Sequence, residues 1–259
     1  MIGRLFGKRR PADVEPAVRT AVPMATRVYA IGDIHGRADL VARLHESIRR
    51  DSADLPAACR KVVVYIGDYI DRGIESRQVI DLLLDEPLEG FESVHLLGNH
   101  EKAMMDFLDD IAIGLDWMSF GGDATLFSYG VGMGKAGNAE ARLAQIQADL
   151  RERLPKRHAE FLASLRLMHT EGDYCFVHAG IRPGVALDRQ TVNDLLWIRE
   201  EFLHSPAAHG KIVVHGHSIT PSPQVRPNRI GIDTGAFATG RLTCLVLEGD
   251  TRRFLQTGE

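Results

Sequence analysis

Aspartate, asparagine and histidine residues recur in five short clusters that also contain glycine. The clusters are Gly32-Asp-Ile-His-Gly36, Gly67-Asp-Tyr-Ile-Asp-Arg-Gly73, Gly98-Asn-His-Glu101, His178-Ala-Gly180 and His215-Gly-His217. Carboxylate, amide and imidazole groups form a mixed oxygen–nitrogen set, which suits Mn²⁺, Fe or Zn²⁺ better than an all-oxygen calcium site. A carboxylate that bridges two such ions holds them about 3.5–4 Å apart, the separation that clamps a displacement at phosphorus. The residue types therefore indicate a metal-dependent hydrolytic centre.

Each cluster taken alone has a simpler interpretation. An Asp-x-His after a strand is usually a turn aspartate that caps the next helix, followed by an incidental histidine. Asn99 is of a type more often found in turns than among metal ligands. His215 and His217 can be hydrogen-bonded histidines at the end of a strand. The conjunction of five clusters, each at the end of a predicted strand, favours a common site.

Strands and helices alternate from Arg27 onward. Apolar runs predict strands over 28–31, 62–66 and 93–97, and helical patterns follow them over 38–50, 76–84 and 101–110, with Ser76 the expected N-cap of the second helix. This alternation is typical of βαβ units with a largely parallel sheet. Ligands bind beyond the carboxyl ends of such strands, so the clusters are expected to converge on one crevice.

The rest of the chain completes the predicted architecture. Residues 139–168 read as two helices interrupted at Pro155, and the last third contains predicted strands over 174–178, 211–215, 229–233, 242–247 and 252–255, with one helix over 191–202. We expect an α/β fold of two packed β-sheets flanked by helices. Residues 1–25 are expected to form a flexible basic leader that contains prolines, and 26–259 one domain with a helical insert at about 102–168.

The composition excludes several classes of protein. Of 259 residues, 44% are hydrophobic and 25% charged, and 31 basic against 35 acidic residues give a net charge of −4. This balance argues against a nucleic-acid or membrane surface. Three scattered cysteines argue against a disulfide framework and fit a reducing compartment. The sequence lacks an apolar run that could span a bilayer, so we expect a cytoplasmic protein without a membrane span. The oligomeric state stays open.

Together the clusters resemble the calcineurin-like metallophosphoesterase superfamily, and within it the bacterial and phage-type PPP serine/threonine protein phosphatases. The resemblance runs from Arg27 to Leu247 and implies a four-layer metallophosphoesterase sandwich. It implies two divalent metal ions, with Mn²⁺ preferred and Fe or Zn²⁺ as alternatives. Asp33 and His35 would bind the first ion, Asp68 would bridge, and the second ion would be completed by Asn99, His178 and His217. His215 falls outside the pattern and is expected to be a strand or supporting residue.

The resemblance also implies roles for neighbouring residues. His100 is the expected general acid, Asp71 orients it, and Arg72 binds the substrate phosphate, while a metal-bridging hydroxide attacks phosphorus. Leu196-Trp-Ile-Arg-Glu200 resembles the Trp-x-Arg-Glu segment of the family, which would make Arg199 a second phosphate-binding arginine. Arg182 is a third candidate. The alternative for Arg199 is a salt bridge on a helix face.

The activity implied is hydrolysis of phosphoserine and phosphothreonine in proteins or peptides, with phosphotyrosine as a further candidate. One alternative is a symmetrical dinucleoside-tetraphosphate hydrolase of the same superfamily. Those relatives usually carry aspartate where Glu101 stands and lack the Trp-x-Arg-Glu segment. A second alternative is a catalytically silent scaffold that binds phosphoproteins, which the intact set of matched residues disfavours.

Overall fold

The computed structural model describes residues 20–135 and 137–258, and two five-stranded β-sheets form its centre. The first sheet has the order β10-β9-β1-β2-β3. Its strands are β1 (Thr26–Ile31), β2 (Arg60–Tyr65), β3 (Glu92–His95), β9 (Thr243–Glu248) and β10 (Thr251–Gln256). The three early strands are parallel to one another. Strand β9 is antiparallel to β1, and β10 is antiparallel to β9.

The second sheet has the order β4-β5-β6-β8-β7. Its strands are β4 (Met168–Glu171), β5 (Tyr174–Val177), β6 (Ile212–His215), β7 (Gln224–Val225) and β8 (Arg229–Gly231). The inner strands β5, β6 and β8 are parallel, and the edge strands β4 and β7 are antiparallel to their neighbours. The sequence patterns missed both edge strands, because β4 follows a helix-rich stretch and β7 has only two residues.

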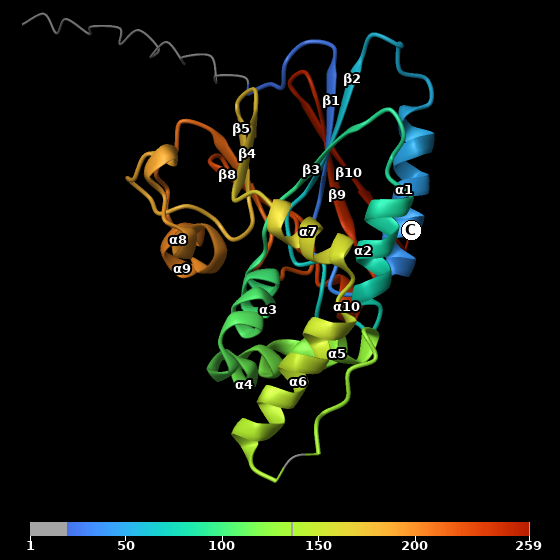
Figure 1. The fold of residues 1–259 in the computed structure, drawn as a ribbon. Coiled ribbons are helices and arrows are strands. Elements are labelled where there is room, and N and C mark those ends of the chain that lie inside the picture. Colours follow the sequence, from blue (N-terminus) through green and yellow to red (C-terminus); the bar gives the residue numbers. More distant parts are fainter. Residues whose placement is uncertain (1–19, 136, 259) are drawn as a thin grey trace, which may run out of the picture.

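Alternation along the strands produces the layers. On β1, Val28 and Ala30 pack into the core between the sheets, whereas Tyr29 and Ile31 pack against the helices on the other face. On β5, Phe176 faces the inner core and Cys175 faces outward. Figure 1 shows the resulting order of helices, sheet, sheet and helices. The covering helices are α1 (Ala38–Ser52) and α2 (Ser76–Asp85) on one side, and α8 (Val192–Trp197) and α9 (Glu200–Leu203) on the other. The predicted two-sheet α/β architecture is confirmed.

Most of the helices between β3 and β4 gather at one end of the molecule (Figure 1). The α-helices of this stretch are α3 (Asn99–Asp109), α4 (Gly114–Trp117), α5 (Asp123–Ser128), α6 (Ala139–Arg153) and α7 (Lys156–Ser164). Pro155 separates α6 from α7 and is the N-cap residue of α7. A short 3₁₀ helix lies at Ile111–Ile113 and a π-helical turn at Met118–Gly122. Two further short helices are Leu187–Arg189 and α10 (Ala236–Thr239). This helical segment supplies several contacts to the site described below.

Two helix predictions need correction. Ser76 is the first residue of α2 and not its N-cap, which is Glu75; the Ser76 hydroxyl instead accepts a hydrogen bond from the backbone N–H of Asp71 at 3.0 Å. The single helix predicted over 191–202 is two helices. Arg199, with φ −131° and ψ −101°, lies outside the helical region and separates α8 from α9.

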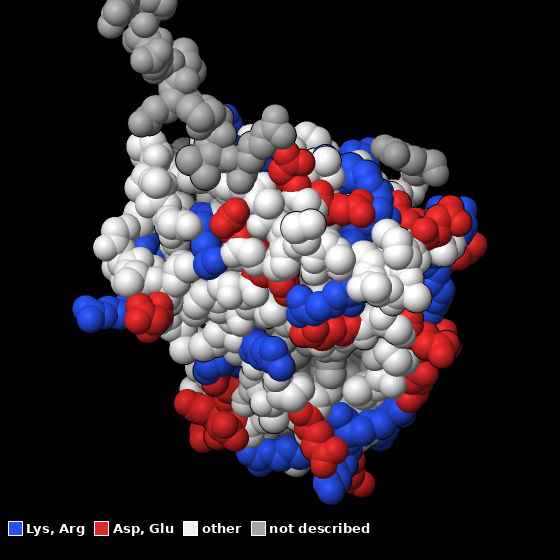
Figure 2. Space-filling model, turned by 90° about the horizontal axis from the view of Figure 1, so that it is seen from above, with Lys and Arg blue, Asp and Glu red and all other residues white. Residues whose placement is uncertain are grey.

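The predicted leader falls mostly outside the described residues, which begin at 20. The described part of it contacts the folded body: Val22 is buried, and its N–H donates to the carbonyl of Gly249 at 3.0 Å. Within the described part of the chain, no helix combines the length and apolar character needed to cross a membrane. Figure 2 shows basic and acidic side chains interspersed over the described part of one face.

Candidate metal centre

The backbone of the predicted clusters is held in an unusual conformation. Six described non-glycine residues have positive φ, and five of them belong to the clusters: His35 (48°), Asp68 (53°), Asp71 (71°), Arg72 (67°) and His217 (61°). Such conformations persist where the surrounding structure enforces them, and they concentrate at functional sites. Glycines allow the loops to approach closely, since a Cβ at Gly216 would collide with Asp33 Oδ1 and a Cβ at Gly98 with Asp68 Oδ1.

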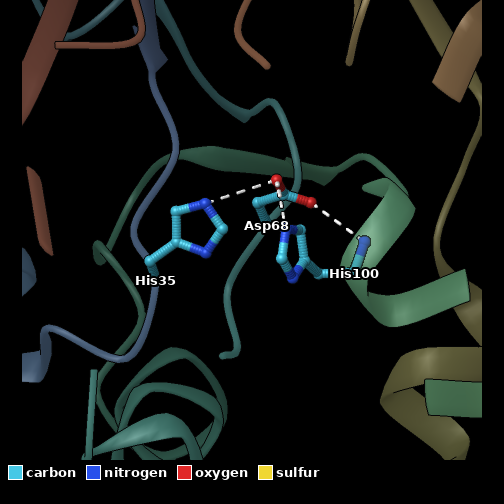
Figure 3. Close-up of side chains that lie close together, drawn as sticks. All are labelled: His35, Asp68 and His100. Carbon is cyan, nitrogen blue, oxygen red and sulfur yellow. Dashed lines mark hydrogen bonds and ion pairs between the residues drawn. The ribbon is translucent and has the colours of Figure 1, made fainter. Parts of the chain in front are cut away.

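The Asp68 carboxylate lies at the centre of the site, between the ends of β1, β2 and β3. Its Oδ2 atom is 3.5 Å from His35 Nε2 and 3.9 Å from His100 Nε2, and Figure 3 shows both imidazoles turned toward it. Its Oδ1 atom is 3.5 Å from His178 Nε2, which the second sheet supplies. Two potential metal-binding groups thus share this carboxylate: one with His35 and His100, the other with His178 and His217.

Asn99 joins the second group. Its Oδ1 atom lies 2.8 Å from His178 Nε2 and 2.9 Å from His217 Nδ1, so an amide oxygen and two imidazole nitrogens converge. His178 Nδ1 is 2.9 Å from the backbone carbonyl of Ile66, so Nε2 is the nitrogen that faces Asn99 and Asp68. The arrangement brings the residues predicted for the second metal to one point.

Asp33 follows the end of β1 and lies close enough to Asp68 for the two charges to interact. Its Oδ2 accepts a hydrogen bond from the backbone N–H of His217 at 2.9 Å, whereas Oδ1 is buried and has no donor among the described residues. A buried carboxylate oxygen without a donor requires compensation. A divalent cation would provide it, so this residue set fits a metal.

Electrostatics at the site also fit cations. Burial raises the pKa of Asp33, and the charges of Asp233 and Asp68 raise it further. Burial would raise the pKa of Asp68 as well, but the surrounding imidazoles outweigh burial and hold that pKa below its usual range. Burial lowers the pKa of His35 to about 3 and also lowers that of His217, so both rings are neutral, the form that binds metals.

His100 is held differently from the other histidines. Its Nδ1 atom lies 2.7 Å from Asp71 Oδ2, and that carboxylate also accepts hydrogen bonds from Trp117 Nε1 at 2.9 Å and Thr125 Oγ1 at 2.6 Å. Burial would lower the pKa of His100, but the charges of Asp68 and Asp71 together raise it. The helical segment therefore holds Asp71 in place, and Asp71 orients the His100 ring and favours its protonated form.

The three predicted arginines differ in their surroundings. Arg72 Nη2 is 3.4 Å from His100 Nε2, and the guanidinium lies over the Phe237 ring, 4.8 Å from its centroid. Arg199 is exposed and donates to the carbonyl of His217 at 3.2 Å and to the Ser218 hydroxyl at 3.5 Å. Arg182 instead forms ion pairs with Asp194 at 2.6 Å and Glu201 at 2.9 Å. A salt bridge was the alternative interpretation of Arg199, but among these arginines Arg182 forms the salt bridges. A role of Arg182 in substrate binding stays a prediction.

Two buried acids at the site were not assigned roles from the sequence. Glu101 accepts hydrogen bonds from the backbone N–H groups of Gly98, Asp68 and Tyr69 at 3.0, 2.9 and 2.7 Å, and so ties two clusters together. Burial and the charge of Asp68 raise the pKa of Glu101 to about 8. Asp233 is the middle residue of Gly231-Ile-Asp-Thr-Gly235, a segment that begins at the last residue of β8. The signal was available, because this segment is a sixth polar cluster with glycine at a strand end.

His215 lies beside the centre without joining it. Its Nδ1 atom is 3.0 Å from the carbonyl of Gly216, and its Nε2 atom is 3.2 Å from Arg229 Nη1. Both nitrogens are therefore engaged away from Asp68. This placement agrees with the supporting role expected for His215.

Comparisons with known proteins fit this geometry. The chain is 27% identical over 227 residues to serine/threonine-protein phosphatase 2 of Escherichia coli, covering 83% of this chain and 90% of that protein. It is 30% identical over 159 residues to a symmetrical bis(5'-nucleosyl)-tetraphosphatase of Methylococcus capsulatus, covering 60% of this chain but only 44% of that relative's length. The fold matches a cold-active protein tyrosine phosphatase with a TM-score of 0.57 at 17% identity, covering 96% of this chain and 89% of that one.

A family model also matches most of the chain. The model described as calcineurin-like phosphoesterase matches residues 26–244, a span that contains all five polar clusters. The two-sheet fold and the groups of metal-binding side chains at the strand ends agree with that match. The chain belongs to the calcineurin-like phosphoesterase family.

Proposed function

We propose that this phosphoesterase is a PPP-type serine/threonine protein phosphatase that removes phosphate from phosphoserine and phosphothreonine in proteins, with phosphotyrosine as a further substrate. The observation that carries the proposal is the His100–Asp71 pair at 2.7 Å, placed between Arg72 and Asp68. An alkoxide is a poor leaving group, so a phosphomonoesterase gains from an acid at this position. The raised pKa of His100 favours the protonated form that such an acid needs.

We further propose that two divalent ions, with Mn²⁺ preferred and Fe or Zn²⁺ as alternatives, are held by Asp33, His35, Asp68, Asn99, His178 and His217. Bound ions of this kind lower the pKa of water and neutralise charge on the phosphoryl oxygens. His100 also lies within reach of Asp68, but the guanidinium of Arg72 beside its Nε2 atom disfavours a second role as a ligand.

The remaining steps belong to residues of the chain. Arg72 and Arg199 approach the centre from opposite sheets and bind the phosphoryl oxygens through their guanidinium groups. His100 donates its proton to the leaving oxygen, and Asp71 keeps the ring oriented through Nδ1. Trp117 and Thr125 hold Asp71 in place through its two carboxylate oxygens.

Hydrolysis of dinucleoside tetraphosphates is the second candidate, because of the 30% identity to the Methylococcus tetraphosphatase. The structure changes the weight of one argument against it. Glu101 accepts hydrogen bonds from backbone N–H groups of the clusters. A glutamate at this position therefore says more about how the loops are positioned than about which substrate is bound. Arg199 in its Trp-x-Arg-Glu segment is the feature that continues to favour the protein phosphatase.

Three free cysteines, two of them buried, support the proposal that the protein works in the reducing cytoplasm.

A substrate comparison tests the proposed activity. Protein loaded with Mn²⁺ would be given a phosphoserine peptide, a phosphotyrosine peptide and diadenosine tetraphosphate, and kcat/KM would be measured for each. We expect the phosphoserine peptide to have the highest value. A clearly higher kcat/KM for diadenosine tetraphosphate would transfer the assignment to the second candidate.

A further inference from the structure

A cavity of about 670 Å³ lies beside the metal centre, between α9 and the segment that carries β7 and β8. Arg199 and Ser218 belong to its lining and also contact the centre, since Arg199 donates to the carbonyl of His217. Arg226 and Arg229 line the cavity beyond them. The cavity and the metal centre therefore have Arg199 and Ser218 as common neighbours.

Arg229 is a buried cation without an anionic partner among the residues that the structure describes. Only 5% of the residue is exposed, and its guanidinium lies at 3.2 Å from the Leu203 carbonyl, the Gln224 side-chain oxygen and His215 Nε2. All these acceptors are neutral, and no carboxylate pairs with Arg229 within residues 20–135 and 137–258. Buried charges in proteins are normally paired, because removing one from water is costly.

Other positive charges line the same cavity as Arg229. Arg199 and Arg226 supply two more guanidinium groups, and both are exposed. Among the described lining residues, Glu200 alone carries a carboxylate, and it lies on the exposed side with His204 Nδ1 at 3.1 Å. Three guanidinium groups against one carboxylate give the cavity a local positive charge, although the whole chain is acidic.

We propose that this cavity is a subsite for a second anionic group of the substrate, a carboxylate or phosphate carried by a residue next to the scissile phosphoresidue. The proposal rests on the proposed protein phosphatase activity. Arg199 would contact the scissile phosphate on one side, and Arg226 and Arg229 would contact the second anion on the other. Guanidinium groups suit both anions because they donate paired, parallel hydrogen bonds. The enzyme would then prefer acidic or multiply phosphorylated sequences.

The test compares two phosphoserine peptides that differ only in flanking residues, serine in one and aspartate in the other. Wild type, Arg226→Gln and the control Arg50→Gln would be assayed with Mn²⁺; Arg226 and Arg50 are both exposed, and Arg50 lies on α1. We expect wild type and the control to favour the acidic peptide by about 5- to 30-fold in kcat/KM, which is below the full value of a charged hydrogen bond because Arg226 is exposed. Arg226→Gln should remove most of that preference, with p-nitrophenyl phosphate hydrolysis unchanged.

The outcomes separate this inference from the proposed function. If wild type cleaves both peptides with equal kcat/KM, the subsite is wrong and the protein phosphatase assignment stands. If p-nitrophenyl phosphate is hydrolysed but neither peptide is, the proposed function fails and the subsite fails with it. If Arg226→Gln, assayed also with diadenosine tetraphosphate, lowers kcat/KM for that compound and leaves both peptides unchanged, the cavity binds polyphosphate and the peptide subsite is wrong.

Discussion

The two sheets contribute to the site in different ways. The first sheet supplies Asp33, His35 and Asp68 together with His100, all nearly fully buried, and Glu101 ties the loop of Asp68 to the loop that precedes His100. Near the second sheet lie His178 and His217, but also the exposed Arg199 and a cavity of about 670 Å³. In the first half, buried contacts fix the geometry and the protonation of the side chains. In the second half, Arg199 and the cavity are accessible to a substrate. Changes in the first half should therefore lower turnover, and changes in the second half should weaken binding.

His100→Asn should produce the largest effect on turnover. Loss of the proposed acid is expected to lower kcat by about 10²–10⁴-fold while metal content stays at the wild-type level. Steady-state kinetics and metal analysis of the same preparations measure both quantities. His169→Asn, on the edge strand β4, is the control and should leave kcat unchanged. An unchanged kcat in His100→Asn would remove its role as the acid.

Asp71→Asn should have an intermediate effect. Loss of the ring-orienting carboxylate is expected to lower kcat by about 10–100-fold, as for partners that position a reacting group. Asp68 and Asp71 raise the pKa of His100 above 6.5 against the effect of burial, so the protonated acid is present below that raised pKa and is lost as pH rises through it. Removing the Asp71 charge should move the alkaline limb of the kcat profile to lower pH. A limb at the wild-type position would show that another group titrates.

Arg199→Ala should give the smallest of these effects and should act on binding. Its guanidinium is exposed, so we expect the inhibition constant for inorganic phosphate to rise by about tenfold, below the full value of a buried charged hydrogen bond. Arg182→Ala is the matched comparison, because that side chain is already paired with Asp194 and Glu201. Equal changes in the two variants would argue against a phosphate-binding role for Arg199.

The parts of the fold and of the site that could be predicted from the sequence are those that local motifs determine. Asp33, Asp68 and Asn99 follow strands that apolar runs reveal, and glycines next to them mark sharp turns, so both the parallel arrangement of these strands and the convergence of the clusters could be expected. Contacts across long sequence separations were not predictable. Thr125 reaches Asp71 across 54 residues from a helix whose sequence carries no sign of that contact. The missing anionic partner of Arg229 likewise emerges only from tertiary packing.

Metal stoichiometry tests the central claim most directly, namely that Asp68 is shared between two metal sites. Mn²⁺ bound per chain would be measured by equilibrium dialysis and elemental analysis for wild type, Asn99→Ala and Asp68→Ala, with circular dichroism to verify folding. We expect two ions per wild-type chain, one in Asn99→Ala, and weakened binding of both in Asp68→Ala. Saturation at a single ion in wild type, or two tightly bound ions in folded Asp68→Ala, would contradict it.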